Sequence, residues 1–335
     1  MIRRTISINS INLKSNPMNS IKQCIGLDEV ESAAEQINAH VIRTPLIFND
    51  VLSRTLNCEV HLKAENLQHE GSFKIRGATN AVLSYAAKAK AEGVIAHSSG
   101  NHAAALARAA RVNGIKATIV MPHNSSKRKL QSVRDQGITP VLCDPSSEAR
   151  QAMTDKLIAS TNAHLIHAYD DPLVIAGQGT VGLEIHQQLE EVDTVLVPVG
   201  GGGLLSGTLI ALKSLKPSIK VFGCEPSWAD DAFRSLSAGS IQLPTRYDTI
   251  ADGLRTSLGG LTFPIIKSLI DGILLVDEQE IRSATRQMVT EARMVAEPSG
   301  AVTLAALNRY SDQFRGQKVA VVISGGNLDM GNCQL

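Results

Sequence analysis

The chain has 335 residues, 43% of them hydrophobic and 19% charged, which is the composition of an ordinary soluble protein with room for two domains. Its 33 basic residues are balanced by 32 acidic ones, and only 3% of the residues are aromatic. Neither a nucleic acid nor an anionic membrane surface is therefore an expected partner. No apolar run has the length of a membrane span.

The first 27 residues carry Arg3, Arg4, Lys14 and Lys22 but no acidic residue. This composition faintly resembles a transit peptide, but a disordered extension of residues 1–27, or a true start at Met18, is the preferred interpretation. The five cysteines show no metal-ligand or redox spacing. Free thiols are typical of a reducing compartment, so a cytoplasmic location is expected.

From residue 59 onward, short β-rich runs alternate with amphipathic stretches. Strands are expected at 59–63, 93–97, 116–121, 140–143, 193–199, 220–224, 273–276 and 318–323. Helices are expected at 74–90 and 101–112, and from about 147 and 204 onward. Nearly continuous Val, Ile and Leu strands between helices indicate parallel sheets covered on both faces, so the fold class is α/β.

Chemically distinctive sequence follows three of these strands: Ser98–His102, Gly200–Gly203 and Ser324–Asn327. Ligands of such sheets bind at the carboxyl ends of strands, so these three junctions are expected to line one crevice.

Four glycines between a buried strand and a helix can turn successive N–H groups toward a phosphate. A tight turn is the alternative, but a turn needs only one or two glycines. Ser98–His102 can hold a carboxylate at a helix N-terminus, although an ordinary helix cap would use the same residues. Lys74 lies among Gly71, Phe73 and Gly77; a lysine packed in this way can lose its proton and act as a nucleophile, whereas most helical lysines are solvated charges.

Together these motifs resemble those of fold-type II pyridoxal phosphate (PLP) enzymes, and most closely the serine racemase and threonine/serine or hydroxyaspartate dehydratase group. The segments that carry the resemblance are Ser72–Gly77, Ser98–His102, Ala176–Thr180, Gly200–Gly203 and Ser324–Asn327. The resemblance implies a tryptophan synthase β-like fold with two open, twisted, mostly parallel sheets and helices on both faces. It also implies a large PLP-binding domain of residues 28–90 and 170–335, a small domain of 91–169 inserted in it, and a homodimer.

By this resemblance, Lys74 carries PLP as a Schiff base and Phe73 packs on the cofactor ring. Asn101 binds the ring hydroxyl and Ser324 meets the pyridine nitrogen, while Gly200, Gly201, Gly202, Gly203 and Leu204 hold the phosphate. A serine, unlike an aspartate, does not keep the ring nitrogen protonated. The ring is then a weaker electron sink, which favours prompt loss of a β-leaving group.

The resemblance also supplies a substrate site. Ser98, Ser99, Asn101 and His102 would hold the substrate, with Arg150 and Thr256 as further contacts. Ser99 is the candidate second base on the face of Cα opposite to Lys74. Tyr169 and Asp170 lie in a stretch that often helps to recognise the substrate.

A metal loop is implied in the same way. Glu225, the carbonyl of Ala229 and Asp231 would bind a divalent cation, and oxygen ligands suit Mg²⁺, Ca²⁺ or Mn²⁺. A capped helix start with acids in its first turn is the alternative.

The sequence thus predicts a PLP-dependent ammonia-lyase that converts L-serine, L-threonine or 3-hydroxyaspartate to a 2-oxo acid and ammonia. Amino acid racemisation is the second enzymatic hypothesis, and both activities can coexist in one site. A non-catalytic protein that binds PLP or an amino acid is the alternative of another class. A nicotinamide dehydrogenase is weakened by the missing Gly-x-Gly-x-x-Gly pattern.

Overall fold

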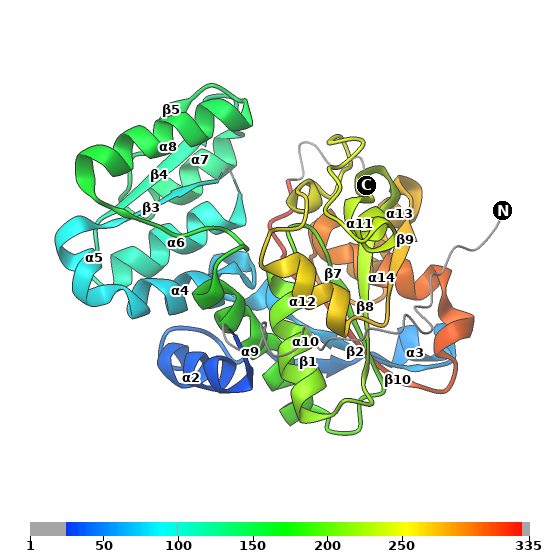
Figure 1. The fold of residues 1–335 in the computed structure, drawn as a ribbon. Helices are drawn as coiled ribbons and strands as arrows, with labels where there is room; N and C mark the ends of the chain where they lie inside the picture. The colour runs from blue at the N-terminus through cyan, green and yellow to red at the C-terminus, as the bar shows by residue number, and fades with distance from the viewer. Residues whose placement is uncertain (1–24, 99, 330–335) are drawn as a thin grey trace.

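Two open sheets make up the molecule in the computed structural model, which describes residues 25–98 and 100–329 (Figure 1). The larger sheet has six strands in the order β1-β2-β10-β7-β8-β9, and only β1 is antiparallel to its neighbour. The smaller has four parallel strands in the order β5-β4-β3-β6. The predicted α/β class with mostly parallel sheets is confirmed.

The larger sheet consists of β1 (Leu46–Phe48), β2 (Glu59–Lys63), β7 (Thr194–Pro198), β8 (Lys220–Pro226), β9 (Gly272–Val276) and β10 (Lys318–Val322). Its helices are α2 (Leu27–Ile37), α3 (Asp50–Leu56), α9 (Pro172–Gln188), α10 (Gly203–Leu215), α11 (Asp231–Ala238), α12 (Thr262–Leu269), α13 (Glu278–Thr290) and α14 (Pro298–Arg309). The smaller sheet consists of β3 (Val94–His97), β4 (Ala117–Pro122), β5 (Val141–Cys143) and β6 (His164–Leu165). The helices α4 (Lys74–Ser84), α5 (Ala86–Glu92), α6 (Asn101–Val112), α7 (Lys127–Arg134) and α8 (Ser147–Thr161) lie around it. Short 3₁₀ turns are η1 (Glu65–Leu67), η2 (His69–Gly71), η3 (Ser227–Ala229), η4 (Asp252–Leu254) and η5 (Ser311–Phe314).

Both faces of the larger sheet are buried, which explains the continuous apolar runs of its strands. In β10, Val319 and Val321 belong to a hydrophobic cluster with α3, α13 and α14. Ala320 and Val322 point the other way, into a cluster with α9, α10 and α12. Because side chains alternate along a strand, β10 contributes residues to two separate hydrophobic cores.

The helices α4 and α5 belong to the core of the smaller sheet. Ile75, Val82 and Ala89 are buried in one cluster with Val94 of β3 and Leu106 of α6. The segment that carries Lys74 therefore leaves the larger sheet after β2 and packs on the smaller one. The domain boundaries given above stay a prediction.

Glycines let α9 pack tightly against both α4 and α10. A Cβ added at Gly177 would lie 2.7 Å from the Cα of Gly77, and one added at Gly207 would lie 2.5 Å from the nitrogen of Gly179. Only a hydrogen fits at such separations. Because α4 begins at Lys74 and α10 at the glycine loop, α9 fixes these two parts of the site relative to each other.

No helix within the described residues is long and apolar enough to cross a lipid bilayer. The predicted extension of residues 1–27 lies outside the described residues as far as residue 24. Ile25 is 5% exposed and packs in a cluster with α2, α9 and α10.

Candidate active site

The end of β10 is hydrogen-bonded to the segment that leads into Lys74. The Phe73 N–H donates to the Ser324 carbonyl at 3.1 Å, and the Gly326 N–H donates to the Gly71 carbonyl at 2.9 Å. Gly71 has a φ of +64°, a backbone conformation that disfavours a side chain. Two motifs about 250 residues apart in the chain thus form one piece of structure.

Lys74 is the first residue of α4 and points its amine toward Ala168. Its Nζ donates to the Ala168 carbonyl at 2.8 Å and lies 5.1 Å from the centre of the Phe73 ring. Burial lowers the pKa of the Lys74 amine to about 8. A useful fraction of this amine is therefore unprotonated and nucleophilic near neutral pH.

The four glycines Gly200–Gly203 form a buried turn between β7 and the first residue of α10. Within residues 25–98 and 100–329, no group accepts a hydrogen bond from their four N–H groups. A Cβ added at Gly201 would lie 2.4 Å from the Tyr169 ring, and Gly202 has a φ of +90°. Buried N–H groups without partners at a helix N-terminus are suited to an anion.

Asn101 begins α6 and lies against both the end of β10 and the start of α14. Its Nδ2 donates to Glu297 Oε1 at 2.8 Å, and its Oδ1 accepts from Asn327 Nδ2 at 2.9 Å. Burial raises the pKa of Glu297 to about 7, with Asp252 adding to the effect. The amide of Asn101 is thus held in one orientation, and one N–H of its Nδ2 is left for a ligand.

Ser324 lies two residues after the end of β10 and is 4% exposed. Its hydroxyl faces the Ser299 carbonyl at 3.5 Å, at the long limit of a hydrogen bond. Among the described residues, this hydroxyl makes no closer polar contact. It is therefore free to serve a weak acceptor such as a pyridine nitrogen.

The predicted substrate residues are distributed over both sheets. Ser98 lies at the end of β3, where its hydroxyl accepts from the Gly100 N–H at 3.3 Å. Thr256 is exposed, with its hydroxyl next to Gly200. Arg150 is on α8 and hydrogen-bonds Ser146 and Ser147 of the same turn. Ser99 lies outside the described residues.

His102 occupies a different environment from these residues. It is 2% exposed and its Nε2 meets the Ile166 carbonyl at 3.0 Å. Burial lowers the pKa of His102 to about 3, so the ring is neutral. The ring points from α6 toward Ile166, which follows β6. Direct contact of His102 with the substrate stays a prediction.

Two buried carboxylates occupy the predicted metal loop. Glu225 accepts from the N–H groups of Ala232 and Phe233 at 2.8 and 3.0 Å, whereas neither carboxylate oxygen of Asp231 has a hydrogen-bond partner within the described chain. Burial raises the pKa of Glu225 well above its usual value and that of Asp231 to about 7. Ala229 is fully buried beside them. The described residues contain no group of three His, Cys, Asp or Glu side chains arranged for a metal, so a cation here would need the backbone oxygen as well.

Sequence patterns gave little weight to Tyr169 and Asp170, and none to Glu297. The Tyr169 ring covers Gly201, while Asp170 accepts hydrogen bonds from the N–H groups of Gly260 and Leu261 at 3.0 and 2.8 Å. Asp170 thus anchors the loop before α12. The acidic residue before Pro172 signals only the cap of α9, which is made by Asp171. The contact of Asp170 with a loop about 90 residues away has no local signal.

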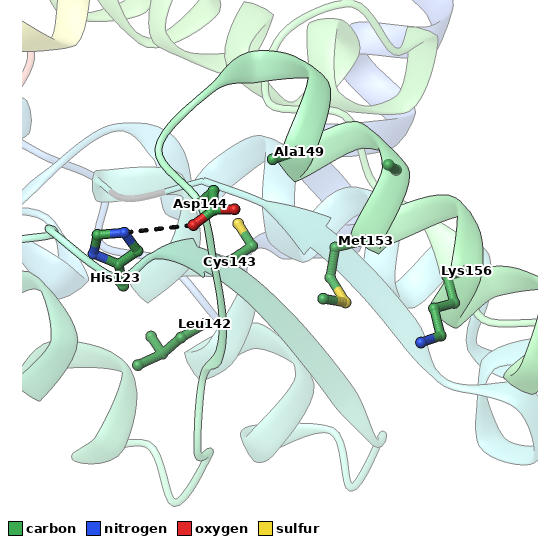
Figure 2. A pocket seen from close by; sticks show the side chains of 8 residues that line it. His123, Leu142, Cys143, Asp144, Ala149, Met153 and Lys156 are labelled. Atoms are coloured by element: carbon green, nitrogen blue, oxygen red, sulfur yellow. Dashed lines mark ion pairs between the residues drawn. The ribbon is translucent and has the colours of Figure 1, made fainter.

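A separate hollow of about 490 Å³ lies on the smaller sheet (Figure 2). It is lined by Leu142, Cys143, Met153 and Lys156, with the His123–Asp144 pair at one side. It shares no lining residue with the site around Lys74.

Comparison with known protein families identifies the family to which the chain belongs. Residues 37–325 match the model of the family described as pyridoxal-phosphate dependent enzyme. The chain belongs to this family. The match includes Lys74 at the start of α4, the glycine turn after β7 and Ser324 shortly after β10.

Known relatives cover nearly the whole chain. A serine racemase of Dictyostelium discoideum is 44% identical over 91% of this chain and 96% of the relative. A beta-hydroxyaspartate dehydratase of Paracoccus denitrificans is 40% identical over 90% of this chain and 96% of the relative. The structure of the processed form of threonine deaminase isoform 2 from Solanum lycopersicum superimposes with a TM-score of 0.90 at 32% identity, covering 99% of this chain and 96% of that one.

The residues present fit PLP. The four unpaired N–H groups of the glycine turn suit its phosphate, and the Lys74 amine with its lowered pKa suits covalent attachment of its aldehyde. This member of the PLP-dependent family therefore has both the anion site and the nucleophile that the cofactor requires.

Proposed function

We propose that this PLP-dependent enzyme is an ammonia-lyase that removes water from a small hydroxy-amino acid and yields a 2-oxo acid and ammonia. The observation that carries the proposal is the Lys74 amine. It is held at 2.8 Å from the Ala168 carbonyl, and its pKa of about 8 lets it exchange a proton near neutral pH. An amine with this pKa can serve first as the attachment point and then as the base at Cα.

Each part of the site has one task in this reaction. The glycine turn holds the phosphate, Phe73 packs on the ring, and Asn101, fixed by Glu297 and Asn327, donates to the ring hydroxyl. Bound PLP would withdraw electrons from Cα and so make its proton acidic. Lys74 takes this proton and passes it to the departing β-hydroxyl, which leaves as water. Hydrolysis of the remaining enamine gives the 2-oxo acid and ammonia.

Ser324 favours prompt elimination over reactions that need a long-lived negative charge at Cα. A serine is uncharged and leaves the ring nitrogen unprotonated, so negative charge at Cα is poorly stabilised and the β-leaving group departs promptly. Ser98, Ser99, Arg150 and Thr256 are proposed to hold the substrate. The names of two relatives, a beta-hydroxyaspartate dehydratase and a threonine deaminase, support elimination as the reaction type.

Racemisation is the second candidate, because a serine racemase is 44% identical to this chain. Racemisation requires a second acid-base group on the face of Cα opposite to Lys74. Ser99 is the candidate for this group because of its position in the Ser98–His102 motif. The two activities share the first proton transfer and diverge after it.

A divalent cation at Glu225, the Ala229 carbonyl and Asp231, and assembly as a homodimer, belong to the same proposal. The unpartnered buried carboxylate of Asp231 supports the cation, because a buried carboxylate without a partner is costly unless a cation balances it. The same proposal includes a large PLP-binding domain of residues 28–90 and 170–335 and a small domain of residues 91–169 inserted in it.

Spectroscopy and a substrate panel test the proposal. Purified protein should show a visible band that borohydride removes, with the reduced cofactor found on Lys74 by peptide mass. A panel of L-serine, D-serine, L-threonine and both 3-hydroxyaspartate diastereomers, with and without a chelator, should release a 2-oxo acid from at least one member. A bound cofactor with no 2-oxo acid and no inverted product from the panel would instead support a non-catalytic binding protein.

A further inference from the structure

Four charged side chains lie buried together next to the first turn of α4. Lys63, Glu65 and Arg76 are each 0% exposed, and the Glu184 side chain is 12% exposed. We call these residues the buried quartet. Lys63 ends β2, Glu65 begins η1, Arg76 lies in α4 and Glu184 in α9, so the quartet joins the larger sheet to the helix that carries Lys74.

Arg76 is the centre of the quartet. Its Nε and Nη2 donate to the two carboxylate oxygens of Glu65, each at 2.8 Å. Its Nη1 and Nη2 donate to the two carboxylate oxygens of Glu184 at 2.7 and 2.9 Å. The Thr180 hydroxyl accepts a further bond from Nη1 at 3.1 Å. Both edges of the planar guanidinium are therefore fixed by paired bonds, which leaves it no freedom to rotate or slide.

Lys63 completes the balance of charge. Its amine donates to Glu184 at 2.6 Å, to the Thr44 carbonyl at 2.8 Å and to Gln188 at 3.0 Å, which uses all three of its N–H groups. Two cations thus face two anions. Burial opposes ionisation of Glu65, but Arg76 and Lys63 hold the pKa of its carboxyl below the usual value.

Arg76 follows Lys74 by two residues, and side chains two apart leave opposite sides of a helix. The guanidinium points into the quartet while the Lys74 amine points to the Ala168 carbonyl. The same turn is held at its start by the Phe73 N–H on the Ser324 carbonyl and at its end by the Gly77 N–H on the Gln178 side chain. Rotation of this turn about the helix axis would move the Lys74 amine and break the paired bonds of Arg76 together.

We infer that Arg76 is a positioning residue of the active site, which sets the rotation of the first turn of α4 and thereby the place of the Lys74 amine. The inference rests on the proposed attachment of PLP to Lys74. Arg76 is fully buried and its guanidinium is bonded to protein groups alone, so any effect of Arg76 on the reaction is expected to pass through Lys74. A purely structural ion pair would stabilise the fold without affecting how fast Lys74 reacts.

Arg76→Lys separates these two roles, because it keeps the charge but loses the planar fork. PLP is removed from each full-length holoenzyme and added back at saturating concentration, and covalent attachment at Lys74 is followed by absorbance and confirmed by borohydride trapping. We expect attachment to slow by about tenfold to a hundredfold, since a misplacement of about 1 Å has effects of this size. Glu65→Gln weakens the same fork from its other side and should also slow attachment.

Lys213→Met is the matched control. It breaks a partly buried ion pair with Asp271 at 2.6 Å, and the Lys213 amine has no hydrogen bond to any member of the quartet. It should lower the melting temperature and leave the attachment rate within about twofold of the unaltered enzyme.

The outcomes separate the two proposals. Lack of covalent attachment in the unaltered enzyme would overturn the proposed function. Normal attachment there, with Arg76→Lys and Glu65→Gln no slower than Lys213→Met, would overturn the positioning role alone. If neither Arg76→Lys nor Glu65→Gln folds, the quartet is required for folding, and this result would also overturn the positioning role.

Discussion

The Nδ2 of Asn101 and the Oε1 of Glu297 are 2.8 Å apart, and this hydrogen bond joins the first turn of α6 to the start of α14. Asn101 follows a strand of the smaller sheet, whereas Glu297 precedes a helix that covers the larger one. The carboxylate is 7% exposed and its pKa is raised to about 7, chiefly by burial. A link between the two sheets thus depends on a group that titrates near neutral pH.

Glu297 should make stability depend on pH. Its pKa is about 7 in the folded protein and near 4.5 when unfolded, so between these values the folded state holds a proton that the unfolded state has released. The free energy of unfolding should therefore fall as pH rises from about 4.5 to 7, by at most about 3 kcal/mol from this group. Urea unfolding of the PLP-free protein across this range measures it.

Glu297→Gln provides the comparison for that measurement. The amide cannot ionise but retains an oxygen that accepts from Asn101. The difference in unfolding free energy between the two proteins should change with pH only between about 4.5 and 7. A difference that is constant across the range would show that Glu297 does not titrate there.

Lys74→Arg should abolish covalent attachment of PLP, because a guanidinium cannot lose its proton and form the bond. Turnover should fall by at least about a thousandfold, the size of effect expected when a nucleophile and base is lost. PLP should still bind through the glycine turn. Borohydride trapping, equilibrium dialysis and 2-oxo acid release measure these three effects, and Lys88→Arg on the exposed side of α5 is the control.

Gly201→Ala should weaken PLP binding, because the added methyl would lie 2.4 Å from the Tyr169 ring. Relieving such a clash costs about 1–3 kcal/mol, which would raise the dissociation constant for PLP by roughly tenfold. Gly260→Ala is the control, since its added Cβ would come no closer than 3.8 Å to Asp170. Tyr169→Ala in the Gly201→Ala background should restore part of the affinity, and a further loss would mean that the ring itself contacts the cofactor.

The strands with the strongest apolar runs could be predicted from sequence to within a residue or two. The strand at 59–63 and the helix at 101–112 have the predicted limits. The helix expected at 74–90 is divided at Tyr85, whose backbone is not helical. The strand β1 gave no signal, since its Ile47 and Phe48 are exposed and it has only three residues.

Tertiary contacts explain what sequence patterns missed. The helix α9 contains Gly177, Gly179 and Gly182, which disfavour a helix in isolation. It is stable because α4 and α10 pack closely against those glycines. The buried quartet had no signal at all, because Lys63 and Glu184 are 121 positions apart and only the fold brings their side chains together. Motifs at strand ends, by contrast, are local and could be predicted.

A divalent cation should stabilise the enzyme through Asp231. After treatment with a chelator, adding Mg²⁺, Ca²⁺ or Mn²⁺ at about a hundred times its dissociation constant should add about 3 kcal/mol to the free energy of unfolding. Asp231→Asn should remove this gain in a melting experiment. Asp230→Asn is the matched control because Asp230 already pairs with Arg234 at 2.9 Å, and an equal loss in both variants would argue against a site at Asp231.

Ser99→Ala should separate racemisation from elimination. Elimination from an L-amino acid needs only the base on the Lys74 side of Cα, whereas inversion needs a proton donor on the opposite face as well. Formation of D-serine from L-serine should therefore fall by about a hundredfold or more, while release of pyruvate from L-serine changes by less than about tenfold. Chiral chromatography and a 2-oxo acid assay on the same reaction follow both products. Ser160→Ala, at an exposed serine near the end of α8, is the matched control. Equal loss of both products in Ser99→Ala alone would show that Ser99 holds the substrate for both reactions and is not a second base.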